Sequence, residues 1–132
     1  MQDRTMTIEP VRRRVRALFA DHVIADTDDA LVVREGDLPP VYYFPVDDVE
    51  MGYLGRSDRQ THCPLKGQAS YFSIKMHSQI ADNAVWAYEE PTPSAETLRG
   101  RLAFDTGQIE VYEIDEADID AGVGHDAARH PG

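Results

Sequence analysis

Short runs of β-forming residues separated by turn residues constrain the fold of this chain most. These runs recur over Val11–Ile114, whereas apolar residues rarely recur at helical spacing. Alternation is clearest over residues 69–76, where Phe72, Ile74 and Met76 share one face of an extended segment. The sequence therefore predicts a mainly β fold of antiparallel strands with at most one short helix.

Turn residues divide this span into elements. The predicted strands are residues 11–20, 22–26, 30–35, 41–45, 49–54, 69–77 and 79–88, and a final pair on either side of Thr106-Gly107. Asp28-Asp29 and Ser78 are typical of hairpin tips, and residues 102–112 are predicted to form a hairpin. Residues 36–40 must form a loop, because Pro39 and Pro40 remove ladder donors. Ser94 begins a single predicted helical turn that reaches Leu98.

The length of 132 residues suits one domain with one core. We predict a flexible N-terminus over residues 1–10 and a single β domain over residues 11–114. From residue 115 to residue 132, large apolar side chains nearly vanish and small and acidic residues dominate. Such a segment buries too little surface to offset its ordering entropy, so we expect this acidic tail to be disordered.

Charge and composition limit the partners that we expect. The formal net charge of −11 opposes binding to nucleic acid or to an anionic membrane. A small molecule of unknown identity, or a protein, is the more plausible partner, and the sequence carries no signal of oligomeric state. We see no export signal and no apolar run long enough to span a bilayer, and the one cysteine forms no disulfide framework. We therefore expect a cytoplasmic protein.

The segment from Thr61 to Gly67 contains that cysteine, with a lysine three positions later. Pro64 supplies the fixed φ of a β-turn, which brings Cys63 and Lys66 close together. An ammonium group beside a thiol favours the reactive thiolate. The alternative is a structural one, in which Cys63 is a small packed residue and Lys66 is solvated.

Aromatic residues gather between positions 42 and 88. Trp86 and Tyr88 share a strand face, and Tyr71 lies off the apolar side of its own strand. Such rings can line a pocket that holds a flat or cationic ligand, although core packing is the more common explanation for any one of them. We predict no metal and no cofactor, because the histidines lack paired metal-ligand spacing and no glycine-rich phosphate loop is present.

Four ordered motifs resemble one family. They are Val41-Tyr42-Tyr43-Phe44-Pro45, Asp48-Val49, Thr61-His62-Cys63-Pro64-Leu65-Lys66-Gly67-Gln68-Ala69-Ser70-Tyr71 and Asn83-Ala84-Val85-Trp86-Ala87-Tyr88. The family is domain of unknown function 427, and the resemblance covers about positions 11 to 114. It implies a compact β-tent fold similar to that of Mss4-like, methionine sulfoxide reductase B and cereblon ligand-binding domains.

Two properties associated with such proteins do not transfer to this chain. Many β-tent relatives hold zinc on two Cys-x-x-Cys pairs, whereas Cys63 stands alone here. The family is also labelled nucleotidyltransferase-like, but this chain has no Gly-Ser followed by paired catalytic aspartates. None of the motif residues has an established role.

Three hypotheses for function follow. The first is a small-molecule-binding β domain whose aromatic pocket is edged by the 61–67 turn, with Lys66 or Arg34 anchoring a carboxylate or phosphate. Its candidate ligand-binding residues are Arg34, Tyr43, Lys66, Tyr71, Trp86 and Tyr88. The second is an enzyme with Cys63 as nucleophile or redox centre and Lys66 as its catalytic partner, and whether the protein is an enzyme stays open. The third is a protein-interaction domain guided by the acidic tail.

Overall fold

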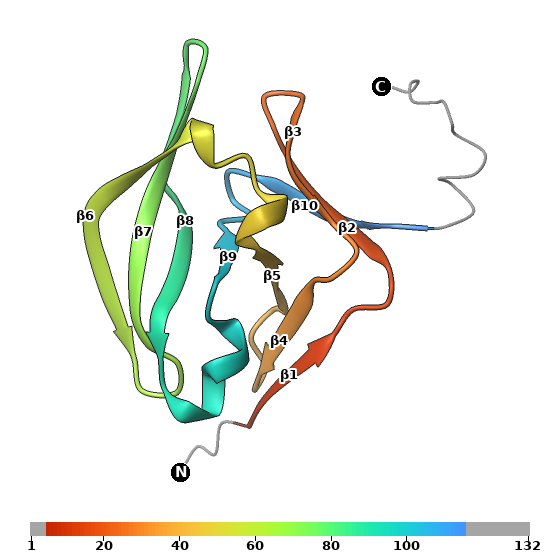
Figure 1. Cartoon of the computed structure of the whole chain (residues 1–132), viewed down its shortest axis with the longest axis vertical. Coiled ribbons are helices and arrows are strands. Elements are labelled where there is room, and N and C mark those ends of the chain that lie inside the picture. Colours follow the sequence, from red (N-terminus) through yellow and green to blue (C-terminus); the bar gives the residue numbers. More distant parts are fainter. Residues whose placement is uncertain (1–4, 116–132) are drawn as a thin grey trace.

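A computed structural model describes residues 5–115, which form ten strands and three short 3-10 segments (Figure 1). The strands are β1 (Met6–Pro10), β2 (Arg14–Phe19), β3 (His22–Thr27), β4 (Leu31–Glu35), β5 (Val41–Pro45), β6 (Leu54–Cys63), β7 (Gly67–Met76), β8 (Gln79–Pro91), β9 (Arg101–Phe104) and β10 (Glu110–Ile114). The 3-10 segments are η1 (Val46–Asp48), η2 (Met51–Tyr53) and η3 (Pro93–Leu98). The prediction of a mainly β fold with little helix is confirmed.

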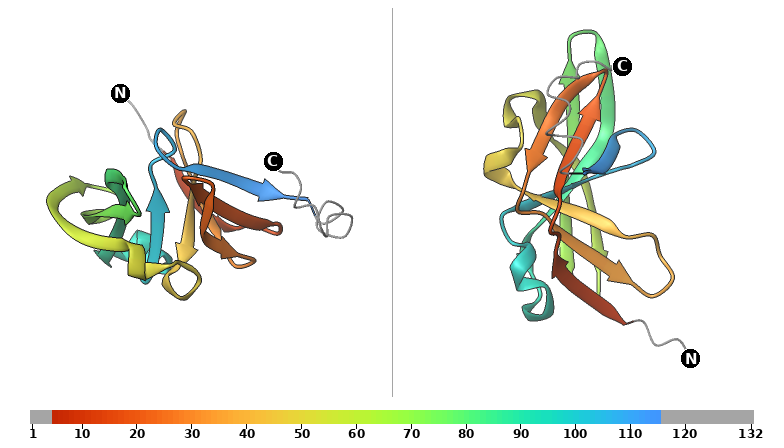
Figure 2. Two further views of the ribbon diagram at one scale, coloured as in Figure 1. Left: turned by 90° about the horizontal axis from the view of Figure 1, so that it is seen from above. Right: turned by 90° about the vertical axis from the view of Figure 1, so that its right-hand side faces the viewer.

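The strands form two antiparallel sheets. The larger has seven strands in the order β1-β4-β5-β9-β8-β7-β6, and the smaller has three in the order β10-β2-β3. The chain passes between the sheets after β1, after β3 and after β9. Seen from above in Figure 2, β6, β7 and β8 lie at one side of the molecule, and β10 lies with β2 and β3 at the other. The seven-stranded sheet therefore has one face toward the smaller sheet and one face away from it.

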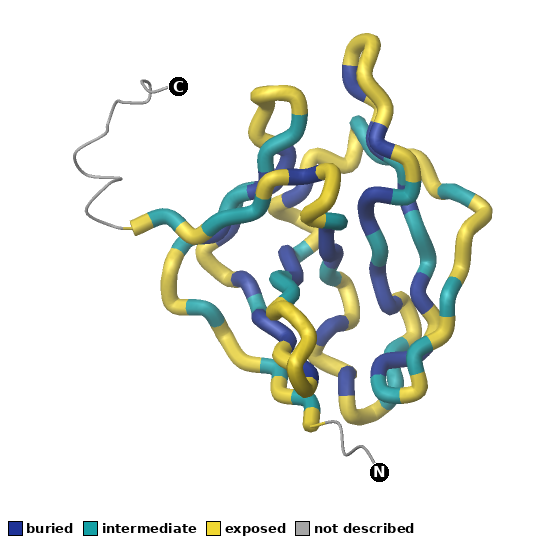
Figure 3. Tube along the Cα trace, turned by 180° about the vertical axis from the view of Figure 1, so that it is seen from behind, coloured by how far each residue is buried: buried dark blue, intermediate teal, exposed yellow. Residues whose placement is uncertain are grey.

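The main core lies between the two sheets. Phe44 and Phe104 are buried edge to face, with ring centroids 5.3 Å apart, and they pack with Val15 and Ile24 of the smaller sheet. Phe72, Ile74 and Met76 join this cluster, which confirms the predicted alternation. Figure 3 marks the buried residues of the strands in dark blue. A second buried cluster lies on the opposite face and includes Tyr43, Tyr88 and Leu98.

Two predicted hairpins are wrong. β9 pairs with β5 and β8, whereas β10 pairs with β2 in the other sheet, so residues 102–112 form no hairpin. Asp28-Asp29 likewise joins β3 of the smaller sheet to β4 of the larger one. The same turn residues can connect two strands of a hairpin or two strands of different sheets. Contacts with strands distant in the sequence decide which strand each one pairs with. The tip at Ser78 is confirmed, because Met76 lies opposite Gln79 in the β7–β8 pair.

Three other segments differ from the prediction. The N-terminal segment predicted to be flexible contains β1, which pairs with β4 from Met6 opposite Glu35 to Pro10 opposite Leu31. Residues 49–54 form no continuous strand, because Val49 makes one bridge to Ala25 before η2 begins. β6 was missed. The predicted disordered tail lies outside the described residues, apart from Asp115.

The loop over residues 36–40 is present. η3 contains the predicted turn of helix, but it begins at Pro93 with Thr92 as its N-cap, and not at Ser94. Over residues 5–115, no helix is both long and apolar enough to cross a membrane.

Candidate functional site

The turn between β6 and β7 has the predicted form. The backbone N–H of Lys66 donates to the carbonyl of Cys63 at 3.2 Å, which closes a β-turn across Pro64. Gly67 follows with φ of 112°, and a Cβ there would lie 3.1 Å from the carbonyl oxygen of Glu90. A side chain at Gly67 would therefore push the turn away from β8.

Lys66 enters the protein interior and forms an ion pair. Its Nζ lies 2.5 Å from Oε1 of Glu35 at the end of β4, and only 8% of Lys66 and 7% of Glu35 are exposed. The same ammonium lies 5.8 Å from the centroid of the Tyr88 ring. A buried charge needs a partner, and Glu35 supplies it. The pair therefore joins the β6–β7 turn to β4 on the face away from the main core.

Four aromatic side chains meet beside this pair, and we call them the aromatic face: Tyr43, Tyr71, Trp86 and Tyr88. The rings of Tyr43 and Tyr88 are 6.4 Å apart, and those of Tyr71 and Trp86 are 6.2 Å apart. Trp86 Nε1 donates to the hydroxyl of Tyr43 at 3.2 Å and so connects the two pairs. Strand alternation explains the grouping, because neighbouring strands turn these side chains to the same face of the sheet.

The aromatic face is neutral and half open. Burial raises the pKa of Tyr43 and of Tyr88 well above the ordinary value, so both phenols keep their protons at neutral pH. Tyr43 and Tyr88 are buried, whereas Tyr71 and Trp86 are only partly buried. The accessible part of the aromatic face thus consists of Tyr71 and Trp86.

Residues of β6 border this accessible part. Cys63 is half-buried and packs against the cluster that contains the aromatic face. The hydroxyls of Thr61 and Tyr71 are hydrogen-bonded at 3.1 Å. The guanidinium of Arg59 lies over the Tyr71 ring, 4.8 Å from its centroid. One edge strand therefore places a thiol, a hydroxyl and a cation along the rings.

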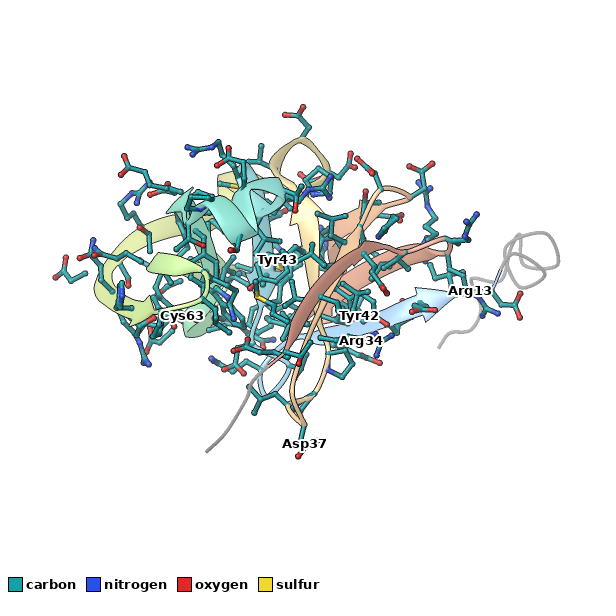
Figure 4. All side chains as sticks on the ribbon, turned by 90° about the horizontal axis from the view of Figure 1, so that it is seen from below. Arg13, Arg34, Asp37, Tyr42, Tyr43 and Cys63 are labelled. Carbon is teal, nitrogen blue, oxygen red and sulfur yellow. The ribbon has the colours of Figure 1, made fainter. Side chains whose placement is uncertain are left out.

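Arg34 is not part of this site. It is exposed, and it precedes Glu35 on β4, so its side chain leaves the sheet on the other face. Figure 4 shows Arg34 and Tyr42 at a distance from Cys63. The hydroxyl of Tyr42 donates to Glu113 at 2.5 Å. Burial and this bond raise the pKa of Tyr42 to about 12, and Arg34 opposes the shift.

Sequence reasoning overlooked Glu35 and Arg59 as site residues. Glu35 lies two positions after Val33, which packs in the second cluster, so alternation along β4 could have placed both on one face. Arg59 lies in a polar, largely exposed strand without apolar alternation. No sequence signal would have found it.

A hollow of about 240 Å³ lies elsewhere, between β3 and η1. It is lined by Val23, Ala25, Asp26, Asp47, Asp48, Val49 and Glu50. Two of its carboxylates already have partners, because Asp26 pairs with Arg14 and Arg16 and Asp48 accepts a hydrogen bond from Thr27. Over residues 5–115, no three or more His, Cys, Asp or Glu side chains form a group that could hold a metal ion.

Comparison with known proteins identifies the family of the chain. No curated protein matches the chain significantly. The family model described as domain of unknown function (DUF427) matches residues 7–115, which is nearly all of the described structure. The chain therefore belongs to the family of domain of unknown function 427.

Proposed function

We propose that this protein binds a small molecule that contains a planar ring, on the aromatic face beside the β6–β7 turn. One observation carries the proposal. Tyr43, Tyr71, Trp86 and Tyr88 meet in one cluster, and two of them remain only partly buried. The main core on the other face of the sheet is closed by the smaller sheet, so these rings are not needed to complete it.

The chemistry of the face supports a ring-shaped ligand. The guanidinium of Arg59 already lies over the Tyr71 ring, so the exposed part of Trp86 offers the electron-rich surface for stacking. The polar tips of both rings are already held in place by Thr61 and Tyr43. Such restraint lowers the entropy that the protein loses when a ligand binds. The buried Lys66–Glu35 pair holds the turn at the border of the face.

The alternative of an enzyme based on Cys63 has less support. That hypothesis needs the ammonium of Lys66 beside the thiol, but the ammonium pairs with Glu35 at 2.5 Å. The alternative of a protein-interaction domain relied on the acidic tail, which lies outside the described residues.

A fragment screen can test the proposal directly. Trp86 is the only tryptophan, so intrinsic fluorescence and the indole N–H signal in NMR report on the aromatic face alone. A fragment present at 100 times its dissociation constant should stabilise the fold by roughly 2.7 kcal/mol in thermal unfolding. We expect ring-containing fragments to shift the Trp86 signal and to raise the unfolding temperature together.

Two tyrosine variants provide a matched comparison. Tyr71→Ala removes one of the two accessible rings of the aromatic face. It should therefore weaken the affinity for a bound fragment by tenfold or more, which corresponds to about 1.4 kcal/mol. Tyr53→Ala is the control, because Tyr53 is also partly buried but packs against the main core and His22. Equal losses in both variants, or hits that leave the Trp86 signal unchanged, would refute binding at the aromatic face.

A further inference from the structure

We infer that Arg59 binds a carboxylate, so that the ligand of the aromatic face is a planar aromatic carboxylate. This inference rests on the proposed function and adds the charge and shape of the ligand to it.

Arg59 is held in place by a ring and not by an acid. Its guanidinium lies 4.8 Å from the centroid of the Tyr71 ring, and the residue is exposed. Over residues 5–115, no carboxylate forms an ion pair with it. A guanidinium whose N–H groups are not paired with an acid can donate them to a ligand, and their fork matches the two oxygens of a carboxylate.

The other cations that lie over aromatic rings are already neutralised. Arg56 lies on the same strand, 5.0 Å from the centroid of the Phe72 ring, but Glu89 accepts hydrogen bonds from both ends of its guanidinium, at 3.1 and 2.8 Å. Lys66 lies over Tyr88 and pairs with Glu35. Arg59 therefore differs from both in having a positive charge without an acidic partner in the described part of the chain.

The surroundings of Arg59 define where the rest of the ligand would lie. The guanidinium of Arg59 lies over the ring of Tyr71, and the hydroxyl of Tyr71 is hydrogen-bonded to that of Thr61 at 3.1 Å. Trp86 is the next ring, 6.2 Å from Tyr71. A carboxylate on the edge of Arg59 would place an attached flat ring along Tyr71 toward Trp86. The hydroxyl pair offers one further donor to the carboxylate.

The negative net charge of the protein is compatible with this ligand. The value of −11 is spread over the chain, and charges more than about 8 Å apart are largely screened at physiological salt. A single carboxylate in contact with Arg59 thus responds mainly to Arg59. A polyphosphate would extend beyond this local positive charge, so we favour a monocarboxylate.

Three probes of one shape and different charge test the inference: 2-naphthoate, the neutral 2-naphthamide and the cationic 2-naphthylmethylammonium. Binding is measured through the NMR signal of the Trp86 indole N–H. We expect naphthoate to bind at least tenfold more tightly than naphthamide, and the cation to bind most weakly. Arg59→Gln should weaken naphthoate binding by about 10- to 100-fold, because a charge-assisted hydrogen bond is lost, and should change naphthamide binding by less than twofold.

Arg56→Gln is the matched control, since it removes a ring-stacked arginine of the same strand whose charge is already paired. It should change neither affinity by more than twofold. Equal affinity for naphthoate and naphthamide, or an Arg59→Gln variant that binds naphthoate normally, would overturn the inference. The proposed function would survive in that case if the probes still shifted the Trp86 signal. If neither these probes nor any screened fragment shifted it, both proposals would be wrong.

Discussion

The two faces of the seven-stranded sheet are built from different kinds of side chain. One face carries Phe44, Phe72 and Phe104, which are buried in the main core together with residues of the smaller sheet. The other face carries Tyr43, Tyr88 and Trp86, which are linked by hydrogen bonds and ring contacts, and it contains a buried ion pair. Tyrosine, tryptophan and charged groups are costly to bury compared with phenylalanine, because each polar atom needs a partner.

We infer that one face of the sheet mainly stabilises the fold and that the other mainly serves recognition. A closed apolar face holds the fold together through burial, whereas polar groups on a half-open face are poorly suited to that purpose. Two adjacent residues of β5 show the contrast, since Phe44 packs in the main core and Tyr43 belongs to the aromatic face. Four measurements test this difference between the two faces.

Phe44→Ala should have the largest effect on stability. The side chain is fully buried and packs edge to face on Phe104, so its removal leaves a cavity and should lower the free energy of unfolding by about 4 kcal/mol. Urea unfolding measures the loss. Tyr71→Ala on the half-open face should cost less than half as much, and equal costs would contradict the division between the two faces.

Glu35→Gln should have the second largest effect. It leaves the ammonium of Lys66 buried without an anionic partner, which should cost about 3 kcal/mol in the free energy of unfolding. The double variant Glu35→Gln with Lys66→Met removes both charges and should recover stability to within about 1 kcal/mol of the natural protein. A double variant as unstable as the single one would mean that the pair is not the source of the loss.

Tyr42→Phe should have a smaller effect that depends on pH. The hydroxyl of Tyr42 joins β5 to Glu113 on β10, and its loss should cost about 1 kcal/mol near pH 8. Because folding raises the pKa of this phenol from 10.0 to about 12, its contribution is complete below pH 10 and is lost as the pH rises through about 12. Urea unfolding at both ends of this range should therefore show the stabilities of the two proteins converging at high pH. A difference in the free energy of unfolding that did not change with pH would contradict the proposed contribution of the Tyr42 hydroxyl.

Arg59→Gln should have the smallest effect on the fold. An exposed guanidinium over a ring contributes about 0.5 kcal/mol to stability, so thermal unfolding should barely change. A loss above about 2 kcal/mol would identify Arg59 as a structural residue and would weaken its role in recognition.

Local patterns in the sequence predicted some of these features and missed others, for physical reasons. Alternation in β7 and β8 predicted which rings share a face, and Pro64 predicted the turn. The partner of Lys66 could not be read from the sequence in this way, because Glu35 lies on a distant strand. Pairing of strands across the molecule is decided by contacts that no local window contains.

β6 illustrates a second limit. The strand is polar and largely exposed, and its backbone hydrogen bonds to β7 are available to almost any sequence. Burial of side chains does not create the strand, so no apolar pattern marks it. The residue proposed to recognise the ligand lies on this strand, where the sequence was least informative.

The order of strands in the smaller sheet has a consequence for synthesis in the cell. β2 and β3 are near the start of the chain, but β10, which pairs with β2 from Leu18 opposite Glu110 to Arg14 opposite Ile114, is the last strand described. While the ribosome is still making the chain, β2 has one unpaired edge, and the main core lacks part of its cover. Contacts between such distant segments form slowly. The smaller sheet therefore cannot be completed, and the main core cannot be fully covered, until β10 has been synthesised.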